Sequence, residues 1–255
     1  MKSQLSAKIP ESNSIPFELI AFRKAVRYQK WVVDSVLPFL GKRILEIGAG
    51  IGNTSRCLPV RDLLVLSEAD KNLVSILEQT VLDNFPTDAP VEAHWVDLEL
   101  DWTVPLGKHN FDTVISFNVV EHIKDDIEIF QQFARILQLG KLAGPKRIVT
   151  FVPAHGWAYG SLDKTHGHCR RYTEDHFKQI IKHLTPNASL YTRYFNLFGL
   201  PNWVLMSRMM GRTTIGEGPI QAFEKICPWV RPVDDFLHQE LRIPFGQSII
   251  AVIGI

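Results

Sequence analysis

Short apolar runs alternate with longer amphipathic stretches along the centre of the chain. Five runs are rich in β-branched or aromatic residues and are bounded by Gly, Pro, Asp or Asn, which predicts buried strands. These runs span residues 43–47, 63–67, 91–96, 111–117 and 147–152. Between them, residues 72–85 and 125–139 keep one face apolar at helical spacing and predict helices. This alternation predicts an α/β fold with a doubly wound sheet of parallel strands.

The pattern changes after the fifth run. A His-rich, aromatic loop is expected over residues 154–172, followed by a helix near residues 173–184. Residues 189–195 and 248–253 are expected to form a sixth and a seventh strand. Residues 196–244 lie between these two strands and are rich in apolar side chains. We expect this segment to be a helical lid inserted before the last strand.

The beginning of the chain carries two further signals. Residues 17–40 have apolar positions at mixed three- and four-residue steps, which predicts one or two helices. Residues 1–16 are rich in Ser and Pro and predict a flexible leader. We therefore expect one domain over residues 17–255, in keeping with the length of the chain.

Composition excludes several classes of protein. Hydrophobic residues at 45% and charged residues at 22% are typical of a globular chain and exclude disordered, collagenous and coiled-coil classes. The 28 Lys and Arg nearly balance the 27 Asp and Glu, so no bias toward nucleic acid or anionic membranes follows. Three widely spaced cysteines predict neither a disulfide framework nor a thiolate zinc site. Without a signal-peptide pattern or an apolar run of membrane-spanning length, a cytoplasmic protein without a membrane span is expected.

A glycine-rich turn directly follows the first predicted strand. Residues 46–52 read E-x-G-x-G-x-G, with glycines at positions 48, 50 and 52. Glycine lets the backbone approach a ligand closely, and a helix that starts after such a turn offers free N–H groups to a negative group. A dinucleotide fingerprint that starts at Gly48 requires glycine at position 53, where this chain has Asn53. An NAD(P)-dependent oxidoreductase is therefore the less favoured hypothesis.

Four motifs, in order, resemble those of the class I S-adenosylmethionine (SAM) dependent methyltransferases. The first is the glycine turn, and the second is Ser67-Glu68-Ala69-Asp70, whose Glu68 resembles the family's ribose-binding carboxylate. The third, Val96-Asp97-Leu98, resembles the adenine site, and the fourth is Ser116-Phe117-Asn118-Val119-Val120-Glu121-His122. The resemblance implies a Rossmann-like methyltransferase fold with seven strands, parallel except for the last, and SAM as cofactor. The cofactor-binding residues that it implies are Glu46, Gly48, Ala49, Gly50, Gly52, Asn53, Glu68, Ala69, Asp97, Leu98, Asn118 and Val119.

Candidate catalytic residues follow the fourth and fifth predicted strands. Methyl transfer from a sulfonium needs a nucleophile held in line, and a base is needed only when the acceptor is a hydroxyl or an acidic carbon. Histidine is the usual base near neutral pH. The candidates are His122, His155, Tyr159 and His166. For His122, a helix-capping role is an equally open alternative.

The next candidates lie in Gly167-His168-Cys169-Arg170-Arg171-Tyr172, which resembles a G-H-x-R-R-Y pattern of a subset of bacterial methyltransferases. Arginine can hold a phosphate or carboxylate through two hydrogen bonds, so these residues are candidates for acceptor binding. The substrate-binding residues that we predict are His168, Arg170, Arg171 and Tyr172. The acids that would instead make the two arginines structural are Glu174, Asp175 and Asp163.

Metal binding is the less favoured hypothesis for this region. Glu121 and His122 resemble part of the metal site of ubiquinone-pathway O-methyltransferases, but Asn118 takes the place of a third, acidic ligand. Residues 166–169 offer two histidines and a cysteine at crowded spacing, without a fourth ligand. We therefore expect no metal.

The favoured function is SAM-dependent methyl transfer to a small or lipid-like acceptor, on oxygen, nitrogen or carbon. The main alternative is a SAM-binding protein that transfers no methyl group and uses the cofactor structurally or to promote a cyclisation. A nucleic-acid partner is not expected, because Asn118-Val119-Val120 stands where many amino methyltransferases carry N/D-P-P-Y/F. The apolar segment 196–244 could cover the acceptor, touch a membrane surface, pack in the core or join two copies, so monomer and homodimer both stay open.

Overall fold

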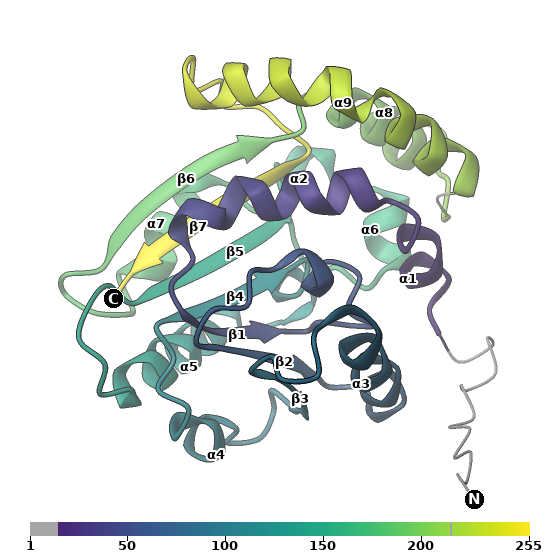
Figure 1. Ribbon diagram of the computed structural model, residues 1–255. Helices are drawn as coiled ribbons and strands as arrows, with labels where there is room; N and C mark the ends of the chain where they lie inside the picture. The colour runs from purple at the N-terminus through teal and green to yellow at the C-terminus, as the bar shows by residue number, and fades with distance from the viewer. Residues whose placement is uncertain (1–14, 215) are drawn as a thin grey trace, which may run out of the picture.

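The chain folds into a seven-stranded sheet with helices on both faces, in a computed structural model that describes residues 15–214 and 216–255 (Figure 1). The strands are β1 (Arg43–Ile47), β2 (Leu63–Glu68), β3 (Val91–Trp95), β4 (Thr113–Phe117), β5 (Arg147–Pro153), β6 (Ser189–Phe195) and β7 (Ser248–Gly254). Their order is β3-β2-β1-β4-β5-β7-β6, in which the first five pair in parallel and β7 is antiparallel to both neighbours. This topology confirms the predicted fold. The predicted leader lies outside the described residues except for positions 15 and 16.

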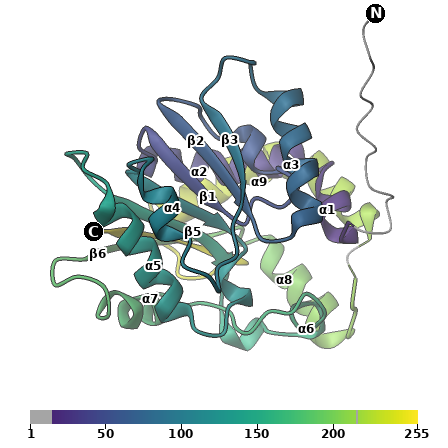
Figure 2. The same cartoon turned by 90° about the horizontal axis from the view of Figure 1, so that it is seen from below.

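Two layers of helices cover the sheet. One layer consists of α2 (Val26–Val36), α3 (Lys71–Asn84) and α9 (Glu217–Gln239), and the other of α4 (Thr103–Gly107), α5 (Asp126–Leu139) and α7 (Glu174–Ile181). Figure 2 shows these layers on opposite sides of the sheet. Successive side chains of a strand point to opposite faces, so Leu45 packs with Phe133 of α5 while Ile44 packs in the cluster of Trp31 from α2. Both cores are apolar, as the continuous apolar runs predict.

Shorter elements complete the chain. The remaining α-helices are α1 (Phe17–Phe22), α6 (Ser161–Thr165) and α8 (Gly199–Trp203). Single 3₁₀ turns are η2 (Leu37–Phe39), η3 (Ser55–Cys57), η4 (Val120–His122) and η5 (Gly156–Ala158), and Val204–Met209 (η6) is a π-helical turn. Several helices begin at a side-chain cap. Asp70 is the cap of α3, because its side chain accepts a hydrogen bond from the Asn72 N–H at 2.8 Å.

The apolar segment 196–244 forms a helical insertion before β7. Its long helix α9 lies beside α2, and Glu224 of α9 accepts hydrogen bonds from the backbone N–H groups of Arg27 and Tyr28 at 3.0 and 2.8 Å. These N–H groups belong to the first turn of α2, where no intrahelical partner exists. Trp31 donates from Nε1 to Asp235 at 3.0 Å. The insertion is therefore fixed to the layer of α2, while its Trp229 side chain remains 81% exposed.

Among the described residues, every helix is too short or too polar to pass through a lipid bilayer.

Candidate functional site

The loop after β1, here called the glycine turn (residues 46–53), has a backbone that only glycine adopts without strain. Gly48, Gly50 and Gly52 have φ angles of 70°, 59° and 82°. A Cβ atom at Gly48 would lie 2.5 Å from Cγ2 of Val119. At Gly52 it would lie 2.7 Å from Cγ2 of Thr80. The turn therefore brings bare backbone close to its neighbours, as expected of a surface that cradles a ligand.

Glu68, at the end of β2, is hydrogen-bonded to the glycine turn. Its Oε2 accepts from the Gly50 N–H at 2.8 Å, and its Oε1 accepts from the N–H groups of Ala69 and Asp70 at 2.8 and 2.9 Å. The strands β3, β2, β1 and β4 lie side by side in this order. Asp97, Glu68, the glycine turn and Asn118 lie at or just after the carboxyl ends of these strands, in the same order. Four predicted cofactor motifs thus meet at one edge of the sheet, where open parallel sheets bind ligands.

Glu46, the last predicted cofactor residue of β1, is a buried carboxylate. It is 2% exposed, and its Oε2 has no hydrogen-bond partner among the described residues. Burial raises the pKa of Glu46 to about 7, an effect to which the charge of Glu68 adds. A buried, unpartnered oxygen suits a cationic or N–H donor from a ligand, because such a donor would satisfy it.

The predicted cofactor residues of the other strands occupy turns. Asn118 follows β4 with a φ of 53° and donates its N–H to the carbonyl of Phe151 at 2.8 Å. Asp97 follows β3, and its Oδ1 accepts from the Glu99 N–H at 3.0 Å, beside the predicted Leu98. A strained non-glycine residue at a strand end is the kind of feature that concentrates at ligand sites.

Helix α1 lies against the glycine turn, which the sequence did not predict. Asn53 donates from Nδ2 to the carbonyl of Leu19 in α1 at 2.7 Å. On its other side, the turn is joined to β2 by the Ala49 N–H, which donates to the Ser67 carbonyl at 2.8 Å. A Cβ atom at Gly50 would lie 3.4 Å from Cδ2 of Leu19. No local signal could reveal this contact, because it joins segments about thirty residues apart that share only ordinary apolar and amide side chains.

The segment after β5, here called the histidine loop (residues 154–172), is organised around Asp163. This carboxylate is 0% exposed and accepts from His168 Nδ1 at 2.9 Å, Arg171 Nε at 2.8 Å and the Gly160 N–H at 2.8 Å. Although burial alone would raise the pKa of Asp163, these partners lower it. The Arg171 guanidinium also donates to Ala154 and lies 4.6 Å from the ring centre of Trp203. The sequence indicated Asp163 only as one of three possible partners of the arginines and did not identify it as the residue that organises this loop.

Arg170 and Tyr172 have internal partners as well. Asp126, at the start of α5, lies 2.6 Å from Arg170 Nη1 and accepts from the Tyr172 hydroxyl at 3.1 Å. His176 Nε2 lies 2.9 Å from the same carboxylate. Tyr172 is 0% exposed, and Arg171 is 5% exposed. These contacts favour the structural alternative for Arg170, Arg171 and Tyr172, although binding of an acceptor by these residues stays a prediction.

The structure separates the predicted catalytic residues into two groups. The ring of His122 lies 4.7 Å from that of His168, and the ring of His166 lies 5.8 Å from His168. Tyr159 joins this group by donating its hydroxyl to the His168 carbonyl at 2.7 Å. Desolvation, together with His168 and His166, lowers the pKa of His122 to about 4, so the ring is neutral at pH 7.

His155 lies in a different environment. Its ring is 6% exposed and stacks on Tyr194 of β6, with ring centres 4.8 Å apart and planes inclined by 2°. Its Nε2 accepts from the Gly246 N–H at 3.4 Å, and its φ is 64°. Burial lowers the pKa of His155. These contacts are those of a packed histidine, and a catalytic role for His155 stays a prediction.

Glu121 belongs to the turn η4 after β4 and is fully buried. It is 0% exposed, and neither carboxylate oxygen has a hydrogen-bond partner in another described residue. Burial raises the pKa of Glu121 to about 8, against the opposing effects of its own backbone N–H and of Arg171. The backbone N–H of Cys169 donates to the Glu121 carbonyl at 2.7 Å, which ties the histidine loop to η4.

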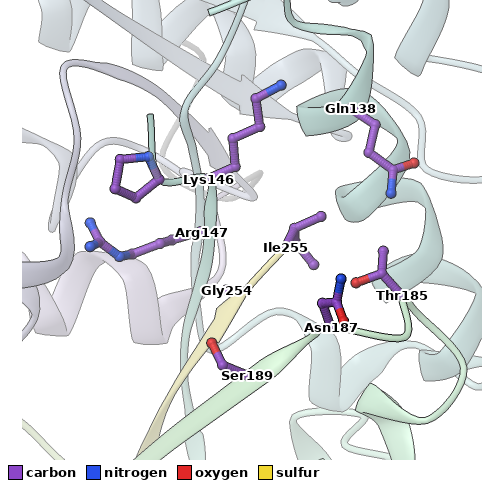
Figure 3. A pocket seen from close by; sticks show the side chains of 9 residues that line it. Gln138, Lys146, Arg147, Thr185, Asn187, Ser189, Gly254 and Ile255 are labelled. Atoms are coloured by element: carbon purple, nitrogen blue, oxygen red, sulfur yellow. The ribbon is translucent and has the colours of Figure 1, made fainter. Parts of the chain in front are cut away.

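Two hollows lie at opposite edges of the sheet. One, of about 650 Å³, is open and lies where β5 begins and β7 ends, with Lys146, Arg147 and Ile255 on its wall (Figure 3). That edge holds the amino ends of the parallel strands, away from the glycine turn. A smaller, mostly apolar hollow of about 120 Å³ lies beneath the insertion, with Tyr28 and Trp203 among its lining residues.

Comparison with known proteins agrees with this geometry. The family model described as "Methyltransferase domain" matches residues 22–184. The search of the curated proteins found no match. Among solved structures, a SAM-dependent methyltransferase from Archaeoglobus fulgidus is similar, with 15% identity, a TM-score of 0.55 and coverage of 94% of this chain and 99% of that one.

Two further structures share the fold. The magnesium protoporphyrin IX methyltransferase of Synechocystis, with bound S-adenosylhomocysteine (SAH), has 16% identity, a TM-score of 0.51 and coverage of 73% and 84%. A phosphoethanolamine N-methyltransferase of Haemonchus contortus has 16% identity, a TM-score of 0.51 and coverage of 89% of this chain and 52% of that one. With the family match spanning more than half of its length, the chain belongs to the methyltransferase-domain family.

Proposed function

We propose that this chain transfers the methyl group of SAM to a small or lipid-like acceptor. The observation that carries the proposal is the glycine turn with the carboxylates of Glu68 and Glu46 beside it. A turn of this shape accepts the carboxylate end of the methionine portion through backbone N–H groups, and Glu46 offers an oxygen to its ammonium group. Glu68 would exchange its bond from the Gly50 N–H for bonds from a ribose diol. The neighbours with bound SAH support this assignment.

The sulfonium of SAM is itself the activated group, so the protein's task is to hold the acceptor in line and to exclude water. The edge of the sheet between Asn118 and the histidine loop is where we place the acceptor atom. Should the acceptor be a hydroxyl, the neutral ring of His122 offers a lone pair that can take up its proton, although a pKa of about 4 makes this ring a weak base. The reaction breaks the methyl–sulfur bond, forms a bond from methyl to the acceptor, and releases SAH.

An uncharged, apolar acceptor is supported by the hollow beneath the insertion. Its wall is rich in aromatic and aliphatic side chains and carries no Lys or Arg. The one acid in its wall, Glu224, is engaged by the N-terminus of α2. A cytoplasmic location, a monomeric or homodimeric state and a lid role for the insertion remain part of the prediction.

The test follows the label of methyl-labelled SAM in a cell extract. Purified protein is added, and the extract is then separated into small molecules, lipids, protein and nucleic acid. We expect label in the first two fractions, and no such transfer with the Gly48→Ala variant. Label in protein or nucleic acid would refute the acceptor class. SAM that binds but is never converted to SAH would favour the alternative of a non-transferring SAM-binding protein.

A further inference from the structure

Three side chains with metal-binding atoms meet between the fourth and fifth strands. Glu121 and His122 belong to the turn η4 after β4, and His168 belongs to the histidine loop after β5. One carboxylate oxygen and one ring nitrogen from each histidine all lie within 4.8 Å of one another. The sequence did not predict this group, because its third member comes from a loop 46 residues after His122.

The buried carboxylate of Glu121 is the strongest indication of a ligand. A fully buried carboxylate normally has hydrogen-bond partners, since burial without them is costly. Glu121 has none in another described residue. Its surroundings also include Arg171, whose positive charge is balanced by Asp163 at 2.8 Å. The two acids Glu121 and Asp163 share one cationic side chain, that of Arg171. When both acids are ionised, the net charge of these three groups is −1, which a bound cation would compensate.

His168 is held as a metal-binding histidine is held. Its Nδ1 bonds to Asp163 at 2.9 Å, and that carboxylate is itself fixed by Arg171 and Gly160. This leaves Nε2 as the ring nitrogen with a free lone pair. A carboxylate behind a histidine fixes the ring and raises its basicity in many metal sites. The hydroxyl of Tyr159 further holds the backbone of His168 at 2.7 Å.

We propose that Glu121, His122 and His168 bind a divalent transition-metal cation with an open coordination position. One carboxylate and two imidazoles suit Zn²⁺, Fe²⁺, Co²⁺ and Mn²⁺ better than Mg²⁺ or Ca²⁺, which prefer oxygen ligands. Separations within 4.8 Å are compatible with a shared cation, because ligands at about 2.0 Å from zinc lie at most about 4 Å from one another and side-chain rotation can adjust the difference. The open position would take an oxygen of the acceptor, a role that rests on the proposed function. With the cation bound, His122 would act as a ligand and not as the base, and the cation itself would lower the pKa of an acceptor hydroxyl.

A second cluster on the same chain provides a matched control. Glu92, His94 and His109 also lie within 4.8 Å of one another. There, however, the Glu92 carboxylate is 44% exposed and already bonded to His94 at 2.7 Å. Although Nδ1 of the buried His109 has no hydrogen-bond partner among the described residues, this cluster lacks a buried, unpartnered carboxylate and is expected to bind a cation weakly.

The test measures Zn²⁺ binding to the full chain without an affinity tag, after dialysis against a chelator. Competition with a chromophoric chelator gives the affinity, and Co²⁺ absorption reports the coordination geometry. We expect one Zn²⁺ per chain for the wild type and for His94→Asn. In His168→Asn and His122→Asn, the affinity should fall at least about tenfold. Circular dichroism and SAH binding confirm that each variant is folded, and two separate ligand variants guard against one that is not.

The proposal is overturned if the wild type binds no Zn²⁺, or if His168→Asn and His122→Asn both retain the wild-type affinity, whether or not His94→Asn does. Failure of the proposed function is a separate outcome. A chain that binds Zn²⁺ through these residues and binds neither SAM nor SAH would retain the metal site and lose the methyltransferase assignment.

Discussion

The glycine turn and the histidine loop lie at the same edge of the sheet, yet they are held by different kinds of contact. In the glycine turn, the shape comes from positive φ angles and from the Gly50 N–H, which donates to Glu68 at the end of the neighbouring strand β2. In the histidine loop, the shape comes from buried charges, with Asp163 bonded to Arg171 and His168. The glycine turn is a stretch of backbone that neighbouring side chains approach so closely that a Cβ atom does not fit at Gly48 or Gly52. The histidine loop contains an ion-pair network that fails when one charge is removed.

The largest expected effect is on stability, from Asp163→Asn. This change leaves the Arg171 guanidinium buried without its counter-charge, so the free energy of unfolding should fall by about 3–5 kcal/mol. Urea unfolding measures it. The control is Asp175→Asn, whose side chain is 86% exposed and should change stability by less than about 0.5 kcal/mol. Equal effects in the two variants would show that the network is not what holds the histidine loop.

The next effect separates the glycine turn from an ordinary turn. Gly48→Ala combines a positive φ with a contact of 2.5 Å to Val119, and we expect SAH binding to weaken by about 2–4 kcal/mol, with or without a loss of stability. Gly211→Ala is the matched control, because Gly211 has a φ of 64° with nothing within 4 Å. The control should lose about 1–2 kcal/mol of stability and keep its SAH affinity. Normal SAH binding by Gly48→Ala would remove the turn from the site.

The third effect concerns the carboxylate at the end of β2. Glu68→Ala should weaken SAH binding by about 1–3 kcal/mol, because the hydroxyl groups of the ligand's ribose lose their acceptor. Calorimetry measures the affinity, and urea unfolding of the same variant reports any damage to the turn. Glu78→Ala, on the exposed face of α3, should bind SAH like the wild type. An unchanged affinity in Glu68→Ala would exclude this residue from the ribose site.

The smallest effect is a pH dependence of the metal-free chain. Because the folded-state pKa of Glu121 is about 8 and its ordinary value is 4.5, the folded state binds more protons than the unfolded state between these values. The stability from this group is complete below pH 4.5 and is lost as the pH rises through 8. Between pH 7 and 8 the loss should be about 1 kcal/mol. Glu121→Gln should flatten this part of the curve, and an identical curve would mean that Glu121 is not buried as a neutral acid.

The sequence predicted the fold because its signals are local. Each strand is a short apolar run that ends at Gly, Pro, Asp or Asn, and helix α3 begins at the capping residue Asp70. The main difference is β4, which starts at Thr113 rather than at Phe111, because Phe111 packs into the core just before the strand begins. The glycine turn was predictable for the same reason, since its residues are contiguous.

The histidine loop was only partly predictable because its partners are set by packing. The sequence offered three acids for Arg170 and Arg171, and the fold selects Asp163 for Arg171 and, for Arg170, an acid on α5 that was not among them. The contact of Leu19 with Asn53 and the approach of His168 to Glu121 also depend on loops meeting at the end of the sheet. Such contacts carry no periodicity or spacing that a single sequence displays.

The most direct test of the central assignment is a calorimetric titration of the folded chain with SAM, SAH and NAD⁺. The account predicts that SAM and SAH each bind at one site per chain and that NAD⁺ releases no heat. It also predicts that Gly48→Ala loses the SAM signal while Gly211→Ala keeps it. Folded protein that binds NAD⁺ at the glycine turn, or that gives no heat with either SAM or SAH, would contradict it.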